Sequence, residues 1–195
     1  MNKLLSALLC VLLLLPVSAA VAGAPTDAVH ATVDGVLSLL KDGSLSKEQR
    51  RDKMRTLINE RFDFRAMSQR TLATNWKKAT EKQQDRFVEL FSQLIQNSYV
   101  GKIEAYTDEV VKYSQEKTEG DRASVETFIV TKSVEIPIDY RMVLRGADWV
   151  VYDVIIEEVS LISSYRSSYR TIVDKEGFDG LFVKMDEKIK ELAAS

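Results

Sequence analysis

The chain has 195 residues, of which 45% are hydrophobic and 29% are charged, as in one ordinary globular domain and unlike a disordered chain. With 27 basic and 29 acidic residues the formal net charge is -2, so a basic surface that binds nucleic acid is not expected. A single histidine, His30, and a single cysteine, Cys10, exclude most metal sites, thiol catalysis and histidine-based triads. We therefore expect no cofactor and no metal, and any catalysis would depend on carboxylates or hydroxyls.

The first 22 residues have the pattern of a secretory signal peptide. Lys3 precedes an apolar run over residues 4–15, and Pro16 and small residues follow through Ala22. The apolar run is too short to span a membrane. We expect cleavage after Ala22, which also removes Cys10, and a single exported domain over residues 23–195 that is held by its core without disulfides.

Helical periodicity dominates the first half of the exported chain. Capping boxes at Ser46 and Thr80 begin a second and a third predicted helix, and Asp63 is interpreted as a helix N-cap. The first predicted helix carries an apolar stripe of Val29, Val33, Val36, Leu37 and Leu40 and ends at Gly43. The third carries a stripe of Phe87, Phe91, Leu94, Ile95, Ser98 and Tyr99.

After residue 106 the hydrophobic period changes from that of a helix to that of a strand. The pattern predicts strands at 109–116, 123–131, 134–145 and 149–157, with Gly120 and Gly146 in hairpin turns. Pro137 indicates either an edge strand or a backbone position without a ladder hydrogen bond. The inward face of the third strand consists of Ile136, Ile138, Tyr140, Met142 and Leu144.

The register of the last hairpin follows from its apolar pattern. A three-residue loop at 146–148 places Arg145 opposite Trp149 and sets Arg141 opposite Asp153 as an ion pair on the outer face. The same register pairs apolar residues throughout, namely Leu144 with Val150, Met142 with Tyr152, Tyr140 with Val154 and Ile138 with Ile156.

Helical periodicity returns at about Ser160 and continues to the end of the chain, interrupted at Gly177. Helices followed by a meander and then by helices predict an α+β fold. The expected architecture is a curved antiparallel β-meander of about four strands, packed by N- and C-terminal helices. Such a sheet can be filled or hollow, and periodicity does not distinguish the two.

Several short segments, taken in order, resemble one family. They are Phe62-Asp63-Phe64, Trp76 with Ala79-Thr80, Tyr152-Asp153, Val159-Ser160-Leu161 and Gly177-Phe178-Asp179-Gly180. In order and spacing they resemble the MlaC family, also called the toluene-tolerance family, over nearly the whole exported chain. Ala73 and Glu158 depart from the pattern, each at a position where the family usually has glycine.

The resemblance implies a nuclear-transport-factor-like fold with an apolar pocket between sheet and helices. Members of the family are periplasmic phospholipid carriers without enzymatic activity. They hold acyl tails in the pocket and shuttle lipid between an outer-membrane lipoprotein complex and an inner-membrane ABC-transporter complex. We therefore expect a periplasmic carrier of phospholipid, and a monomer, since no apolar helix face is left over.

The resemblance favours a hollow over a filled core, although core packing is the simpler interpretation of each residue singly. Arg166 and Arg170 are hypothesised to lie near the mouth and to attract the lipid phosphate, whereas the simpler interpretation is a solvated helix face. The expected lining is Trp76, Phe87, Phe91, Leu94, Tyr99, Ile103, Ile138, Tyr140, Met142, Leu144, Val150, Tyr152, Val154, Tyr165 and Tyr169.

Two alternatives remain open. The first is an enzyme of the same fold that acts on a small apolar substrate through a pocket carboxylate. Asp139 and Asp153 argue against it, because both are expected to point away from the apolar face. The second is a structural adaptor, which predicts a filled core.

Overall fold

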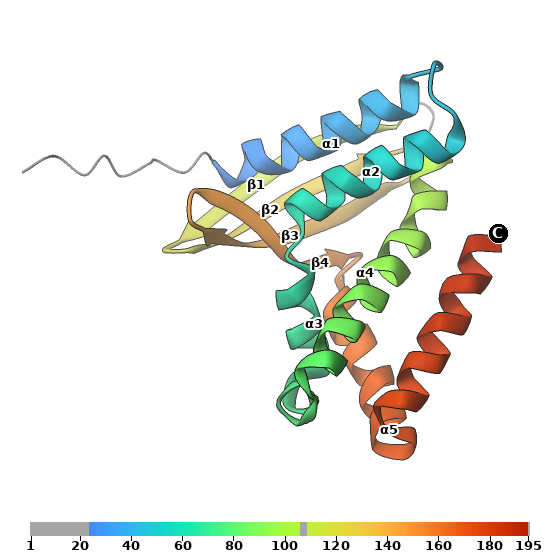
Figure 1. Ribbon diagram of the computed structural model, residues 1–195. Helices are drawn as coiled ribbons and strands as arrows, with labels where there is room; N and C mark the ends of the chain where they lie inside the picture. The colour runs from blue at the N-terminus through green and yellow to red at the C-terminus, as the bar shows by residue number, and fades with distance from the viewer. Residues whose placement is uncertain (1–23, 106–108, 195) are drawn as a thin grey trace, which may run out of the picture.

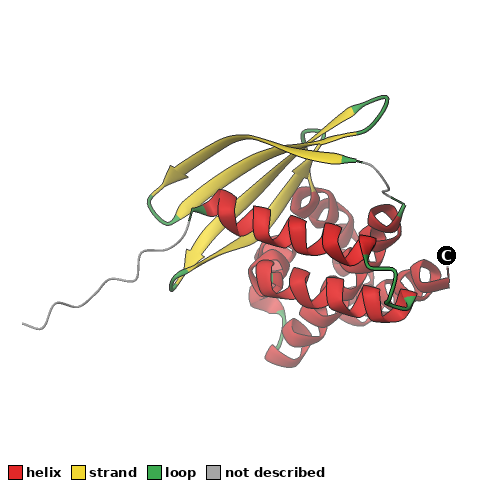
Figure 2. Ribbon diagram, turned by 90° about the horizontal axis from the view of Figure 1, so that it is seen from above, coloured by secondary structure: helices red, strands yellow, loops and turns green. Residues whose placement is uncertain are grey.

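The computed structural model describes residues 24–105 and 109–194, so the predicted signal peptide lies outside the described residues. Helices and strands follow in the order α1 (Pro25–Lys41), α2 (Lys47–Arg61), α3 (Phe64–Leu72), a 3-10 helix (Ala73–Lys78), α4 (Glu81–Glu104), β1 (Val110–Glu119), β2 (Arg122–Val130), β3 (Glu135–Arg145), β4 (Asp148–Ile156), β5 (Val159–Ser160) and α5 (Leu161–Ala194). The helices gather on one side of the sheet (Figure 2). The predicted α+β class is confirmed.

The strands form an antiparallel meander in the order β1-β2-β3-β4-β5. The four predicted strands are present, and the two-residue β5 was not predicted. Pro137 lies in β3 at the centre of the sheet, so the edge-strand interpretation is wrong. Its carbonyl oxygen accepts a hydrogen bond from the backbone N–H of Glu157, at 3.1 Å.

The hairpin between β3 and β4 differs from the predicted register near its turn. Two residues connect the strands instead of three, so Arg145 pairs with Asp148, and Met142 pairs with Val151. The predicted three-residue loop is therefore wrong. The two-residue loop begins at Gly146, whose φ of 63° favours glycine.

A β-bulge in β4 reconciles this turn with the remaining pairs. The register shifts after Arg141, and one extra residue, Tyr152, is accommodated on β4. Residues on the turn side of the bulge therefore exchange faces relative to the prediction. Trp149 and Val151 are buried in the core on the inner face of the sheet, and Val150 lies on the other face.

Beyond the bulge the predicted pairs are present, including Arg141 opposite Asp153. The expected ion pair between them is not among the contacts of the described residues. Asp153 is buried instead, and its carboxylate accepts hydrogen bonds from the Ser160 hydroxyl (2.7 Å) and the Ile162 backbone N–H (3.3 Å). It therefore caps the start of α5.

The helix starts follow from local sequence. The side chains of Ser46 and Thr80 each accept a hydrogen bond from the backbone N–H three residues on, at 3.2 and 3.3 Å. The side-chain oxygen of the glutamine at that position accepts a hydrogen bond from the backbone N–H of the cap residue. Both predicted capping boxes are confirmed. Asp63 is confirmed as an N-cap, since its carboxylate accepts from the Ala66 backbone N–H at 2.8 Å.

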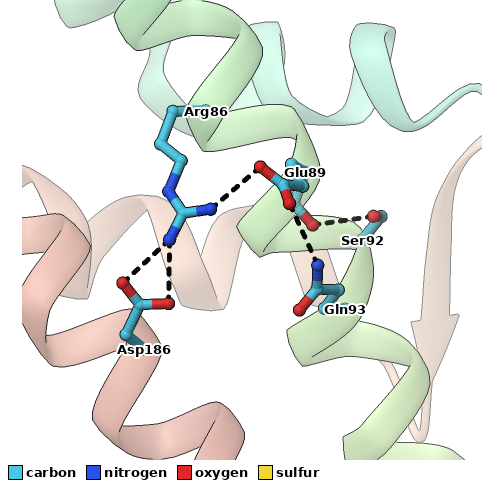
Figure 3. A network of polar contacts seen from close by, with 5 residues as sticks. All are labelled: Arg86, Glu89, Ser92, Gln93 and Asp186. Atoms are coloured by element: carbon cyan, nitrogen blue, oxygen red, sulfur yellow. Dashed lines mark hydrogen bonds and ion pairs between the residues drawn. The ribbon is translucent and has the colours of Figure 1, made fainter.

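Helix α5 folds back on itself at Gly177, where φ is 69° (Figure 1). Its second half packs on α4 through the fully buried Leu181 and Met185. On the surface of this contact Arg86 of α4 donates two hydrogen bonds of 3.0 Å to Asp186 of α5 (Figure 3). The chain thus forms a helical core between α3, α4 and α5.

A second core lies between α1 and the inner face of the sheet. Val29 of α1 packs there against Val125, Met142 and Val151. Phe62, at the end of α2, contacts both cores. The space between the two cores is the location of the candidate site.

Candidate functional site

An apolar cavity of about 350 Å³ lies between the sheet and the helices. Its wall is formed by α1, the C-terminal ends of α2 and α4, the inner face of β1 to β4 and the first residue of α5. Size and lining are those of sites that bind small apolar molecules. The polar and charged residues in its wall, tyrosine aside, are Thr32, Arg61, Gln96, Lys102, Glu109 and Glu157.

Helix α1 contributes its whole apolar stripe to the cavity. Val29 is buried, whereas Val33, Val36, Leu37 and Leu40 are half-buried and line the cavity. Close packing of α1 on α2 fixes this orientation. At Gly35 of α1 an added Cβ would lie 2.9 Å from the Leu57 side chain.

The predicted lining did not include this stripe. Its helical periodicity was visible in the sequence, but an apolar stripe against a cavity has the same pattern as a stripe against a core. Only the large share of β-branched and aliphatic side chains in this segment could have indicated it.

The sheet supplies the opposite wall. Ile138, Tyr140 and Val154 were predicted as lining, and the structure places all three on the cavity. Met142 and Leu144 follow on the same face of β3, but they pack in the sheet core beyond the cavity. The alternation of β3 therefore identified the correct face, and it could not show where along the face the cavity ends.

Helix α4 reaches the cavity only with its last turns. Tyr99 and Ile103, both predicted as lining, lie on it, and burial raises the pKa of the Tyr99 phenol. At 24 residues α4 is about 36 Å long, so its first turns lie far from the sheet. The other predicted aromatic and aliphatic residues pack in the helical core instead: Trp76, Phe87, Phe91, Leu94, Tyr165 and Tyr169.

The remaining predicted site residues also lie away from the cavity. The bulge displaces Val150 and Tyr152 from the inner face of the sheet. The guanidinium of Arg70 lies over the Tyr152 ring, 4.1 Å from its centre. Arg166 donates a hydrogen bond to the Arg70 carbonyl oxygen at 2.9 Å. Arg170 is exposed and pairs with an aspartate one turn on. Neither arginine is at the mouth, because α5 runs away from the cavity after its first residue.

Three hydrogen bonds connect the elements of the cavity wall near the end of α2. The Arg61 guanidinium donates hydrogen bonds to the Thr32 hydroxyl (3.1 Å) and to the Trp149 carbonyl oxygen (2.5 Å), which joins α2 to α1 and to β4. Gln96 of α4 is buried and donates to the Asn59 side chain at 2.8 Å.

The cavity reaches solvent at the end of the sheet that lies opposite Arg61 and the turn between β3 and β4. Lys102 and Glu157 of its wall are exposed. A bidentate ion pair fixes α4 to α2 nearby, where Arg51 donates hydrogen bonds of 2.9 and 2.7 Å to Glu104. This contact holds the pKa of Glu104 below its usual range, despite burial.

The residues that line the cavity provide few groups for catalysis or metal binding. The described part of the wall contains no histidine, and its carboxylates belong to Glu109 and Glu157, near the solvent end. Among residues 24–105 and 109–194, no group of three His, Cys, Asp or Glu side chains could hold a metal ion. None of the described helices is long and apolar enough to cross a bilayer.

Fold and cavity together define a small α+β binding protein with an internal apolar site. The sequence profile of the MlaC family, described as "MlaC protein", matches residues 30–187. The chain belongs to the MlaC family.

Two curated relatives are similar in sequence. The intermembrane phospholipid transport system binding protein MlaC of Haemophilus influenzae is 23% identical over 128 residues, which are 63% of this chain and 60% of that protein. The toluene tolerance protein ttg2D of Pseudomonas putida is 24% identical over 182 residues, 88% of this chain and 83% of that protein.

One solved structure shows the same fold. The phospholipid-binding protein of Ralstonia solanacearum, in complex with a phospholipid, superposes with a TM-score of 0.79. It is 24% identical in sequence, and the match covers 88% of this chain and 99% of that one.

Proposed function

We propose that this chain is a periplasmic phospholipid carrier that shields acyl chains in the cavity between α1 and the sheet. The observation that carries the proposal is the enclosed apolar volume of about 350 Å³. The names of the relatives and the phospholipid bound to the Ralstonia protein support the class of ligand. The acyl-chain contacts are then made by the α1 stripe, with Tyr99, Ile103, Ile138, Tyr140 and Val154 on the facing walls.

The volume indicates how much lipid fits. If a methylene occupies about 30 Å³, similar to a water molecule in the liquid, the cavity accommodates about a dozen methylenes. Removing these from water is favourable by about 10 kcal/mol. Two acyl chains of about thirty methylenes would need about 900 Å³ on the same scale, so binding both requires the sheet and the helices to separate further.

The energetics suit a carrier. A bilayer stabilises the same acyl chains about as well as the cavity does, so exchange between the two is near balance. Net direction must come from partner proteins. We propose the outer-membrane lipoprotein complex and the inner-membrane ABC-transporter complex of the family as these partners, a monomeric carrier between them, and removal of residues 1–22 on export.

An enzyme is less well supported. The described wall lacks a base paired with an acid, and Asp139 and Asp153 do not line the cavity. A filled adaptor core is not compatible with the cavity.

The proposal is tested by native mass spectrometry and organic extraction of protein purified without detergent. We expect diacyl phospholipid at about one molecule per chain. Val36→Trp should strongly reduce this occupancy, because an indole in the α1 wall takes up space that the acyl chains need. Val183→Trp is the matched control, since Val183 is 57% exposed on α5, and it should retain the lipid.

Two results would contradict the proposal. The first is gently handled wild-type protein that carries no phospholipid. The second is full occupancy in the folded Val36→Trp variant, which would place the lipid elsewhere on the molecule.

A further inference from the structure

Arg61 places a cationic group in the cavity wall, away from the other charged wall residues, which are Lys102, Glu109 and Glu157. It is the last residue of α2 and is half-buried. Its two hydrogen-bond acceptors, the Thr32 hydroxyl and the Trp149 carbonyl oxygen, are both neutral. They hold the guanidinium in place and leave its charge uncompensated.

None of the ion pairs among the described residues includes Arg61. A guanidinium carries five N–H donors, and the two contacts use two of them. A partly buried charge beside apolar walls is costly unless an anion pairs with it. The remaining donors are therefore available to an anionic ligand in the cavity.

Arg61 and the solvent end lie at opposite ends of the sheet. Its partner Trp149 is next to the turn between β3 and β4, and the exposed Glu157 follows the other end of β4. Trp149 and Glu157 are eight positions apart, which corresponds to about 26 Å along an extended strand. A ligand with its head at Arg61 would extend its chain along the α1 stripe toward the solvent end.

We propose that Arg61 recognises the carboxylate of a single-chain fatty acid, which enters the cavity head first. The planar guanidinium matches a carboxylate in two parallel hydrogen bonds. The cavity of about 350 Å³ accommodates a single chain of about a dozen methylenes. This second ligand class uses the cavity of the proposed function, but it does not depend on phospholipid transport.

The test compares two ligands of equal chain length that differ only in the head. Lipid-free purified protein is titrated calorimetrically with dodecanoate and with 1-dodecanol at about pH 8, where the carboxylate is ionised. Wild type should bind dodecanoate at least about tenfold more tightly. Arg61→Gln should bind both ligands equally, with an affinity for dodecanol within about twofold of wild type.

Arg170→Gln is the control, because it removes an exposed arginine of α5 that does not line the cavity. It should retain the preference for dodecanoate. If Arg61→Gln does not fold, Arg61→Met, which keeps the aliphatic length, takes its place, and Arg61→Lys should restore part of the preference.

Three outcomes of the calorimetric titrations would overturn the inference. They are equal binding of both ligands by wild type, a preference that persists without Arg61, and a preference that is lost in Arg170→Gln. Phospholipid occupancy is measured separately on each variant. Loss of bound phospholipid in Arg61→Gln would also overturn the inference, because it would indicate that Arg61 binds a lipid phosphate. Unchanged phospholipid occupancy would show that the proposed function does not depend on Arg61.

Discussion

Ala73, which ends α3 and is the first residue of the 3-10 helix, has φ 50° and ψ -118°, a conformation that favours glycine. Glu158, in the turn between β4 and β5, has φ 66°. These are the two positions at which the chain departs from the glycines of the family pattern. The turns form nevertheless, so the strain is carried by the backbone and is offset by packing elsewhere.

Ala73→Gly should therefore stabilise the protein. Relief of strain outweighs the added flexibility of the unfolded chain, and we expect the free energy of unfolding to rise by about 1 kcal/mol in urea titrations. Ala31→Gly, at an exposed position inside α1, should lower it by about 1 kcal/mol. A destabilised Ala73→Gly would show that the conformation at Ala73 is not strained.

The Arg51–Glu104 pair makes stability depend on pH. Because the hydrogen bonds from Arg51 lower the folded-state pKa of Glu104, the pair stabilises the protein above the unfolded-state pKa, and this contribution is lost as pH falls through the folded-state pKa. Glu104→Gln should lower the free energy of unfolding by about 1 kcal/mol at neutral pH. The difference from wild type should shrink as pH falls below the ordinary glutamate pKa of about 4.5.

The control is Glu191→Gln, which removes a surface ion pair with Lys188 on α5. It should change the free energy of unfolding by less than about 0.5 kcal/mol at neutral pH. A difference between Glu104→Gln and wild type that stays constant with pH would refute the role of the carboxylate.

At the scale of elements, the second half of α5 is attached to α4 by apolar packing more than by charge. Leu181 is fully buried, whereas the Arg86–Asp186 pair is 40% exposed on both sides (Figure 3). The reversal at Gly177 brings these groups to α4. The attachment is what closes the helical core around Phe87 and Phe91.

Leu181→Ala should lower the free energy of unfolding by about 3 kcal/mol, because it leaves a cavity in the helical core. Arg86→Met should cost less than about 1 kcal/mol, as expected for an exposed ion pair. Thermal and urea unfolding of the two variants gives the comparison. Equal losses would mean that the ion pair contributes as much as the packing.

At the scale of the whole molecule, two cores flank a space that neither fills. The helical core is closed by aromatic side chains, among them Phe87, Phe91 and Tyr169. The sheet core is closed by Met142 and Trp149 at the turn end of β3 and β4. Between them α1 spans the sheet without enough bulk to fill the gap. The cavity is thus a consequence of the spacing between two well-packed regions.

Local patterns in the sequence were sufficient to predict the helices and strands, because periodicity and caps depend on neighbouring residues. The capping boxes, the N-cap at Asp63, the break at Gly177 and the inward face of β3 all depend on residues a few positions apart. The sequence also identified the family through an ordered set of segments. Five of the fifteen expected lining residues lie on the cavity, those on the sheet face and at the end of α4.

Which apolar stripe faces the cavity and which faces a core depends on packing between distant elements. The stripes of α1 and α4 have the same pattern, and their roles depend on the distance of each helix from the sheet. The bulge at Tyr152, which turned Val150 to the other face, depends on contacts across strands, and so does the position of Arg61 beside Trp149. Such contacts join residues up to 88 positions apart, and no local pattern encodes them.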